Sequence, residues 1–228
     1  MLAVLYDVHG NLPALEAVLA DARQAGAERY LLGGDYALFG AWPADTVARL
    51  RELDATWIRG NGERWTARPA DAPDDEVVQG AIGSSRDELG EGLVGELAAL
   101  PTQHTDRDVR YCHASPPSDV RSFFPQPGDD EAELLAGVEE SRLVFGHTHL
   151  QFRRRSGHGG IELVNPGSVG MPFDGDPRAG YALAGPDGEI ELRRVTYDHR
   201  ASAAAVRLRF PQFGETVARR IEGASFDV

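Results

Sequence analysis

The sequence predicts an α/β fold in which helices cover a mostly parallel sheet. Through the first third of the 228 residues, a short apolar run, a polar or glycine-rich elbow and a stretch with helical spacing recur in that order. This is the order of βαβ units, whose connections give parallel strands. Hydrophobic residues make up 42% of the chain, which is enough apolar material for a sizeable core.

The elements of this first third follow from the pattern. Residues 2–6 form the first predicted strand, and a capping asparagine and an early proline open a helix over residues 11–26. Residues 30–32 and 56–59 are the next two strands. The helix between them covers residues 43–53, where apolar residues recur on one face.

The middle of the chain is less regular. Residues 66–101 are acidic, alanine-rich and interrupted by glycine, and we expect two helices there that form a cap-like insertion. Strands are expected over residues 109–112 and 143–145, with a helix over residues 130–138 between them.

The last third has a different pattern. Several short alternating strands between residues 150 and 195, separated by turns, predict a second, antiparallel-rich sheet. Two helices split by Pro211 are expected from residue 201 onward. We therefore expect one domain over residues 1–200 and a C-terminal helical extension, residues 201–228, packed on that domain.

Charge and composition exclude several classes of protein. The 23 basic residues are all arginine and are outnumbered by 36 acidic residues, which gives a formal net charge of −13. This charge rules out bulk electrostatic binding to nucleic acid or to an anionic membrane. The absence of lysine excludes a Walker-type phosphate loop and a Schiff-base lysine.

The single cysteine, Cys112, can form neither an intramolecular disulfide nor a cysteine-rich metal site. No segment approaches the roughly 18 to 20 apolar residues of a membrane span. The N-terminus also lacks the basic flank and the longer apolar stretch of a secretory signal. We therefore expect a cytoplasmic protein without a membrane partner.

Seven side chains of types that bind metal ions come shortly after the predicted strands. They are Asp7 and His9 after the first, Asp35 after the second, Asn61 after the third, His113 after the fourth, and His147 and His149 after the fifth. Each motif alone is as easily read as a turn, a helix cap or a buried histidine. Because the carboxyl ends of parallel strands share one edge of a sheet, their joint occurrence predicts a single site there.

The types of ligand indicate which ions the site binds. Two carboxylates, one amide oxygen and four imidazoles without a thiolate favour Mn²⁺, Fe or Zn²⁺ over an oxygen-only Mg²⁺ or Ca²⁺ site. Seven ligands are too many for one ion. If a carboxylate bridges, two ions about 3.5–4 Å apart can clamp a phosphoryl group and generate a hydroxide nucleophile.

Five sequence blocks resemble those of the calcineurin-like metallophosphoesterase superfamily, and the similarity spans nearly the whole chain. They are Asp7-Val8-His9-Gly10-Asn11, Gly34-Asp35, Gly60-Asn61, Cys112-His113 and Gly146-His147-Thr148-His149. Two further segments resemble those of the small bacterial and archaeal phosphodiesterase branch of that superfamily. They are Asn165-Pro166-Gly167-Ser168-Val169-Gly170 and the pair Tyr197-Asp198.

The resemblance implies a four-layer α/β/β/α sandwich, here with C-terminal helices, and a dinuclear site that hydrolyses phosphoric mono- or diesters. By motif, Asp7, His9 and His149 hold the first metal, Asp35 bridges, and Asn61, His113 and His147 hold the second. Mn²⁺ is the favoured ion, with Fe, Zn²⁺ or Ni²⁺ as alternatives. Asn61 and His113, together with the hydroxide beside Asp35, are then the expected catalytic groups.

One position departs from the pattern of the superfamily. Gly62 stands where these blocks usually carry a histidine that assists the leaving oxygen. General-acid help at this position, commonly worth about 10²–10⁴ in rate, is therefore absent. We expect either a preference for acidic leaving groups or a substitute donor, His104 or Tyr36. Arg59 and Arg64 are candidates for gripping a second phosphate substituent.

The leading functional hypothesis is metal-dependent hydrolysis of a phosphodiester by a metal-bound hydroxide. A phosphomonoesterase or nucleotide hydrolase with the same site is the alternative, and a non-catalytic metal-binding scaffold is the alternative of another class. The expected partner is a small-molecule phosphate ester or a nucleotide, without stable nucleic-acid binding. The sequence gives no prediction of the oligomeric state.

Overall fold

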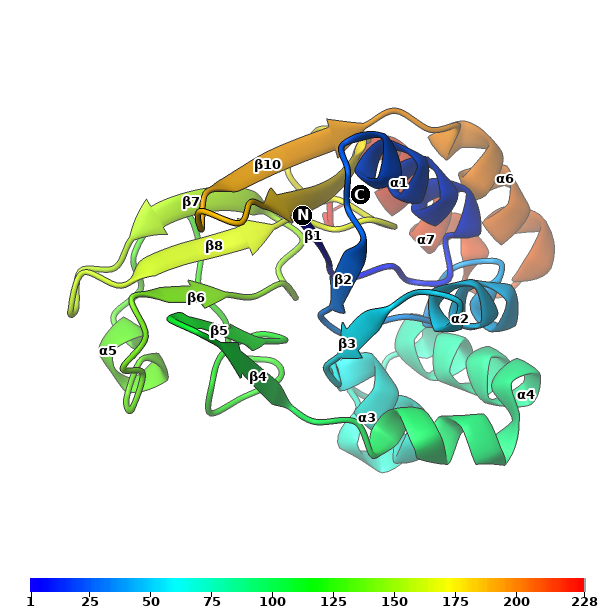
Figure 1. Ribbon diagram of the computed structural model, residues 1–228. Helices are drawn as coiled ribbons and strands as arrows, with labels where there is room; N and C mark the ends of the chain where they lie inside the picture. The colour runs from blue at the N-terminus through cyan, green and yellow to red at the C-terminus, as the bar shows by residue number, and fades with distance from the viewer. Residues whose placement is uncertain (228) are drawn as a thin grey trace.

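The computed structural model describes residues 1–227 and contains two mixed five-stranded sheets that pack face to face (Figure 1). The first sheet has the strand order β10-β9-β1-β2-β3. Its strands are β1 (Leu2–Leu5), β2 (Arg29–Leu32), β3 (Ala55–Trp57), β9 (Ala179–Ala184) and β10 (Ile190–Val195). The pairs β1–β2 and β2–β3 are parallel, as the βαβ pattern predicts, and β9 runs antiparallel to both β1 and β10.

The second sheet has the order β4-β5-β6-β8-β7. Its strands are β4 (Gln103–Asp106), β5 (Val109–Cys112), β6 (Arg142–Val144), β7 (Gln151–Arg155) and β8 (Glu162–Pro166). The three central strands are parallel, and the edge strands β4 and β7 are antiparallel to their neighbours.

The prediction that residues 150–195 build a sheet of their own is wrong. Strands β7 and β8 join the second sheet through parallel pairing of β8 with β6, whereas β9 and β10 extend the first sheet through pairing of β9 with β1. The strands β8 and β9 are buried along most of their length, and each lies inside its sheet with a paired strand on both sides.

The helices flank these sheets. They are α1 (Leu12–Gln24), α2 (Pro43–Arg51), α3 (Asn61–Ala67), the 3₁₀ turn η1 (Pro69–Asp71), α4 (Glu76–Ala98), α5 (Glu131–Leu134), α6 (His199–Arg209) and α7 (Gly214–Gly223). Residues 66–101 hold the turn η1 and α4, and α4 consists of two helical segments joined at the non-helical residue Gly90, where φ is +72°, so the two helices expected there are present. The helix expected over residues 130–138 is the single turn α5, and Gly137 beyond it has a left-handed φ of +78°.

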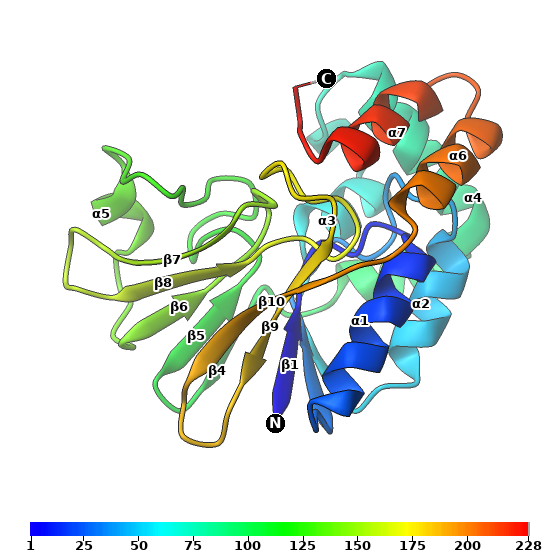
Figure 2. The ribbon, with the colours of Figure 1, turned by 90° about the horizontal axis from the view of Figure 1, so that it is seen from above.

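Side-chain alternation along the strands separates the layers. In β1, Ala3 and Leu5 pack with α1, whereas Val4 packs against Tyr111 and Val164 of the second sheet. The outer face of the second sheet is covered by a cluster around α5 and the loop that precedes it. The order helix, sheet, sheet, helix is therefore confirmed, although α5 makes the fourth layer thin (Figure 2).

Helices α6 and α7 pack beside α4, around Ile82, Val206 and Val217 (Figure 2). The Asp198 carboxylate caps α6 by accepting a hydrogen bond from the Ala201 amide at 2.9 Å. This packing supports our proposal that the C-terminal helices form an extension on the same domain. None of the helices described for residues 1–227 combines the length and apolar character that crossing a bilayer requires.

Candidate metal centre

The seven predicted ligands follow strands of both sheets, not of one sheet as the sequence suggested. Asp7 and Asp35 follow β1 and β2 of the first sheet, and Asn61 begins α3 just after β3. His113 follows β5 of the second sheet, and the His147 and His149 pair follows β6. The two sheets face each other (Figure 2). Ligand atoms from strand ends of both sheets lie within 4.8 Å of one another, so the polar groups meet between the two halves of the sandwich.

Five of the seven residues form two compact groups that share one carboxylate. The ligand atoms of Asp7, His9 and His149 lie within 4.8 Å of one another, and so do those of Asp7, Asp35 and His113. All five side chains are buried. The Asp35 carboxylate reaches both groups, because its Oδ2 lies 3.9 Å from His9 Nε2 and its Oδ1 lies 3.5 Å from His113 Nε2.

Three of the histidines are oriented by backbone carbonyls. A carbonyl oxygen only accepts, so the nitrogen that contacts it must carry the proton. The Nδ1 atoms of His9, His113 and His149 donate to Leu38 O at 3.1 Å, Gly33 O at 2.8 Å and Met171 O at 2.5 Å. Each Nε2 therefore presents a lone pair to the centre, the arrangement found for metal-binding imidazoles.

The lone pairs show that the site fits a cation. His9 Nε2 lies 3.0 Å from His149 Nε2, and neither carries a proton, because both rings donate from Nδ1. Asp7 Oδ1 is buried beside them and has no hydrogen-bond partner within residues 1–227. Such facing acceptors repel each other unless a positive charge lies between them.

The second half of the site shows the same pattern. The side-chain oxygen of Asn61 lies 2.9 Å from His113 Nε2, whose ring already donates from Nδ1 to Gly33. The same amide atom lies 2.8 Å from His147 Nδ1. Reversing the Asn61 amide would turn an N–H donor toward the two imidazole nitrogens. A cation held by the Asn61 oxygen and the His113 and His147 rings satisfies these three groups equally well.

Burial keeps the imidazoles in the form that binds metal. It lowers the pKa of His9 and of His147 to about 3, and it lowers the pKa of His113 and His149 as well. Neutral imidazole is the ligating form. Burial raises the pKa of Asp7 and Asp35, and bound cations reverse such a shift by favouring the carboxylate.

The backbone at these ligands is strained. Asp7, His9, Asp35, His147 and His149 all have φ between +51° and +67°, in the left-handed region that side chains other than glycine rarely adopt. Strain of this kind persists only where surrounding contacts impose it, and it gathers at functional sites. With this conformation, residues two apart in the chain, Asp7 and His9, both contribute ligand atoms to the same group.

Glu63 braces the predicted site, although the sequence assigned no role to it. Its buried carboxylate accepts hydrogen bonds from the amides of Asp35 at 3.0 Å, Tyr36 at 2.8 Å and Gly60 at 2.8 Å. It thereby ties the strained loop after β2 to the start of α3. The signal for it was its position three residues after Gly60, the spacing of a capping box.

Residues 1–188 match the profile of the calcineurin-like phosphoesterase superfamily domain. The chain belongs to this superfamily. An uncharacterised protein of Methanocaldococcus jannaschii is 30% identical over 93% of this chain and 95% of its own length. The phosphodiesterase YfcE of Escherichia coli is 28% identical over 78% of this chain and 83% of its own. A metallophosphoesterase from Sphaerobacter thermophilus superposes with a TM-score of 0.83, at 26% identity over 98% of both chains.

Gly62 of this phosphoesterase lies against the Asp35 carboxylate. The Gly62 amide donates to Asp35 Oδ1 at 2.7 Å. A Cβ atom at this glycine would lie 2.8 Å from the same oxygen, closer than side chains tolerate. The glycine therefore allows the backbone to approach a predicted metal ligand.

Two residues expected to replace the missing general acid lie in the wrong places. His104 is on the edge strand β4 and lines a cleft with Leu2 and Arg29, at the amino ends of β1 and β2, away from the centre. The Tyr36 hydroxyl is fully buried, lies 2.6 Å from Ile58 O and 2.8 Å from Leu32 O, and accepts from the Gly34 amide. Neither side chain can reach a substrate at the metal centre.

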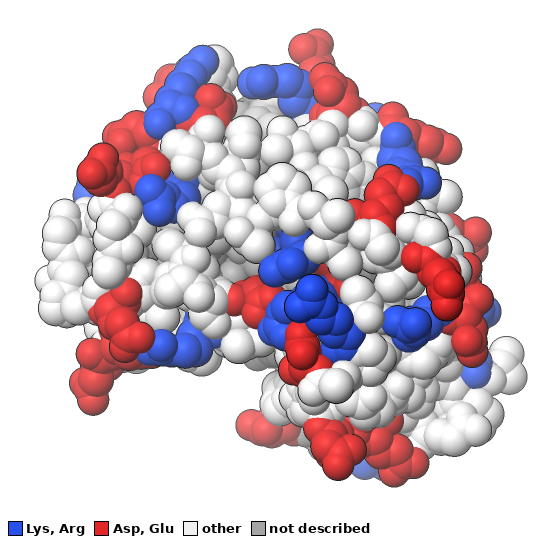
Figure 3. Space-filling model, turned by 90° about the horizontal axis from the view of Figure 1, so that it is seen from below, with Lys and Arg blue, Asp and Glu red and all other residues white. Residues whose placement is uncertain are grey.

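Arg59 and Arg64 line a cleft of about 430 Å³ that also contacts His113. The Arg64 guanidinium is already paired with Asp119, at 2.6 Å from Nε and 2.7 Å from Nη2. Arg59 Nη1 lies 3.4 Å from Ala98 O, and its buried Nε has no partner within residues 1–227. Figure 3 shows basic and acidic side chains side by side in the middle of the face seen from below. Arg59 is therefore the less neutralised of the two.

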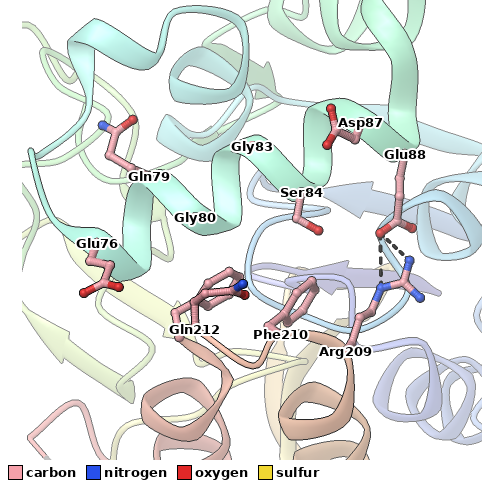
Figure 4. Close-up of a pocket in the computed structure, with 11 residues that line it drawn as sticks. Glu76, Gln79, Gly80, Gly83, Ser84, Asp87, Glu88, Arg209, Phe210 and Gln212 are labelled. Atoms are coloured by element: carbon pink, nitrogen blue, oxygen red, sulfur yellow. Dashed lines mark hydrogen bonds and ion pairs between the residues drawn. The ribbon is translucent and has the colours of Figure 1, made fainter.

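A wider cleft, of about 830 Å³, lies between α4 and the turn from α6 to α7 (Figure 4). Phe210 and Phe213 line it, and its one arginine, Arg209, is paired with Glu88. None of the seven predicted ligands lines this cleft. Its size alone does not make it the active site of the phosphoesterase, because it lacks the convergent polar groups that the metal centre has.

Proposed function

We propose that this phosphoesterase hydrolyses phosphoric diesters with two divalent metal ions, Mn²⁺ being the preferred ion. The observation that carries the proposal is the pair of facing lone-pair clusters, one at His9 and His149 and the other at Asn61 and His113, with Asp35 reaching both. Such a layout suits two ions and is unsuited to a closed structural site, which takes four ligands and often thiolates.

The seven proposed ligands form one set for each ion, with one carboxylate between the two sets. In the proposal, Asp7, His9 and His149 hold one ion, Asn61, His113 and His147 hold the other, and Asp35 lies between them. Two divalent ions bound here lower the pKa of water and neutralise charge on a phosphoryl group. His113 lines the cleft that contains Arg59, and Asn61 contacts His113, so in the proposal these two residues also orient the phosphoryl oxygens.

The proposed preference for diesters rests on a relative, and a separate preference for acidic leaving groups rests on one residue. YfcE, 28% identical to this chain, is named a phosphodiesterase. Gly62 supplies no proton to a leaving oxygen, and His104 and Tyr36 do not replace it. We therefore expect faster turnover of esters with acidic leaving groups, which depart without protonation.

The test compares a chromogenic aryl phosphodiester with the matching monoester. Protein stripped of metal is assayed before and after addition of Mn²⁺, with Asp35→Asn as the site variant and Asp129→Asn, at an exposed position, as the matched control. We expect activity that requires metal, favours the diester and falls at least about 100-fold in Asp35→Asn only. A faster monoester reaction would favour the phosphomonoesterase alternative. No turnover of either ester by fully loaded protein would favour the scaffold.

A further inference from the structure

A row of three aromatic rings leads from the metal centre to the surface. The ring of Phe173 stacks on His149, with centroids 4.4 Å apart and an interplanar angle of 18°. Phe226 meets Phe173 edge to face at 5.5 Å and 72°. The Phe173 amide also donates to His149 O at 3.2 Å, so the row is fixed to a predicted ligand by the backbone.

The outermost ring is held in place although it is exposed. Phe226 is 56% exposed, and the Arg220 guanidinium carbon lies 4.1 Å from its centroid. Arg220 Nε donates to Phe226 O at 3.2 Å, and the Gly175 amide donates to Ala224 O at 2.9 Å. The segment after α7 therefore lies beside the loop that follows β8 (Figure 2). A fixed, half-exposed ring is a preorganised surface for stacking.

The two sides of the centre differ in character. On the His9 and His149 side, Phe39 lies 5.5 Å from the His9 ring, and Phe173 packs in the same apolar cluster as Phe39. On the His113 side, the cleft is lined by charged groups such as the Arg64 and Asp119 pair. In chemical character, the aromatic side therefore matches a planar apolar substituent of a phosphate ester better than the charged side does.

We propose that Phe226 is a specificity-determining residue that stacks on a planar aromatic group of the substrate, as a nucleobase provides, while the phosphate lies at the metal centre. This inference rests on the proposed function and adds the substrate class to it. One face of the Phe226 ring is covered by Arg220, and the substrate ring takes the remaining exposed surface. Every base has such a π-face, so the contact selects planar groups over aliphatic ones without selecting one base.

The experiment measures binding to the full chain loaded with Mn²⁺ by titration calorimetry. The probes are adenosine 5′-monophosphate and ribose 5-phosphate, which share the phosphate and the sugar and differ in the base. We expect the wild type to prefer the nucleotide, and Phe226→Ala to reduce that preference about five- to thirty-fold without weakening ribose 5-phosphate. Phe226→Trp keeps a ring and retains the preference.

The control is Phe124→Ala, because Phe124 is 54% exposed and lies on the loop before α5. It leaves both affinities unchanged. Absence of a preference in the wild type, or a preference that survives in Phe226→Ala, overturns the stacking role. Diester hydrolysis by the same preparation separates the two proposals, because failure of stacking leaves that activity intact, whereas failure of the proposed function abolishes it in the wild type as well.

Discussion

Gly62 has no side chain that could assist a leaving group, but its backbone amide contacts the Asp35 carboxylate. This amide donates to Asp35 Oδ1 at 2.7 Å, and a Cβ atom at the same residue would lie 2.8 Å from that oxygen and force it to shift. A histidine placed here would push on the carboxylate before it could assist a leaving group. The glycine is therefore part of the support of the metal centre.

We predict that Gly62→Ala lowers Mn²⁺ affinity about 10- to 100-fold, the usual effect of disturbing a group that orients a ligand. We also predict that Gly62→His lowers turnover of esters with poor leaving groups. Calorimetric metal titration and diester kinetics measure the two effects.

The matched control is Gly83→Ala on α4, where an added Cβ meets no described atom within 4 Å. This change is expected to leave metal affinity unchanged and to stabilise the helix by about 0.5–1 kcal/mol. Faster turnover in Gly62→His would show that the position does accommodate an acid and would refute this account of it.

The polar residues of the site could be located from the sequence, but the directions in which their side chains point could not. Asp7 and His113 were predicted to be neighbours because each comes just after an apolar strand, but the strand ends that meet belong to two facing sheets and not to one. His104 and Tyr36 were misplaced because the side that a side chain faces depends on which strands pair. Phe226 carried no motif, and its position depends on how α7 docks.

Among the elements, the loop after β2 and helix α3 act as one unit through Glu63. The carboxylate satisfies three backbone amides, including that of the strained residue Asp35. The three amide donors are buried around this one carboxylate, so water cannot take its place as their acceptor.

We predict that Glu63→Ala lowers the free energy of unfolding by about 2–4 kcal/mol, since buried amides lose their acceptor. Glu63→Gln, which keeps one acceptor oxygen, costs less. Urea denaturation measures both. Glu76→Ala, at an exposed position in the first turn of α4, serves as the control and stays within about 0.5 kcal/mol of the wild type. An equal loss in Glu63→Ala and the control would contradict the bracing role.

Element assignments from the sequence succeeded where the apolar pattern was strong and local. The strand β1 and the helix α1 were predicted because the apolar run, the capping asparagine and the glycine after the helix agree. The edge strand β4 was missed because Gln103–Asp106 has no apolar alternation, and only pairing with β5 makes it a strand. Assigning β7 to β10 to two sheets requires long-range pairing that no local pattern contains.

Across the whole molecule, the buried imidazoles make the metal-free fold sensitive to acid. The pKa of His9 falls from 6.5 to about 3 because burial disfavours its charged form. The folded state therefore binds fewer protons than the unfolded state between these values, and stability is lost as the pH falls from about 6.5 towards 3. Glu63 acts in the opposite sense, because its raised pKa of about 7 favours the folded state at low pH.

We predict that His9→Gln flattens the fall in stability between pH 6.5 and pH 3, because it removes one imidazole that must charge on unfolding. Urea denaturation of metal-free protein across this range measures the slope. His158→Gln, at an exposed position outside the cluster, is the matched control. A slope in His9→Gln that equals that of the wild type would contradict the burial argument.

In our proposal, the chain holds two metal ions in one shared site. The most direct measurement is the number of Mn²⁺ ions per chain, determined by equilibrium dialysis and elemental analysis at saturation. We predict two ions for the wild type and one for His149→Ala, which keeps the Asn61 and His113 half of the site. One ion or none in the wild type would contradict the account.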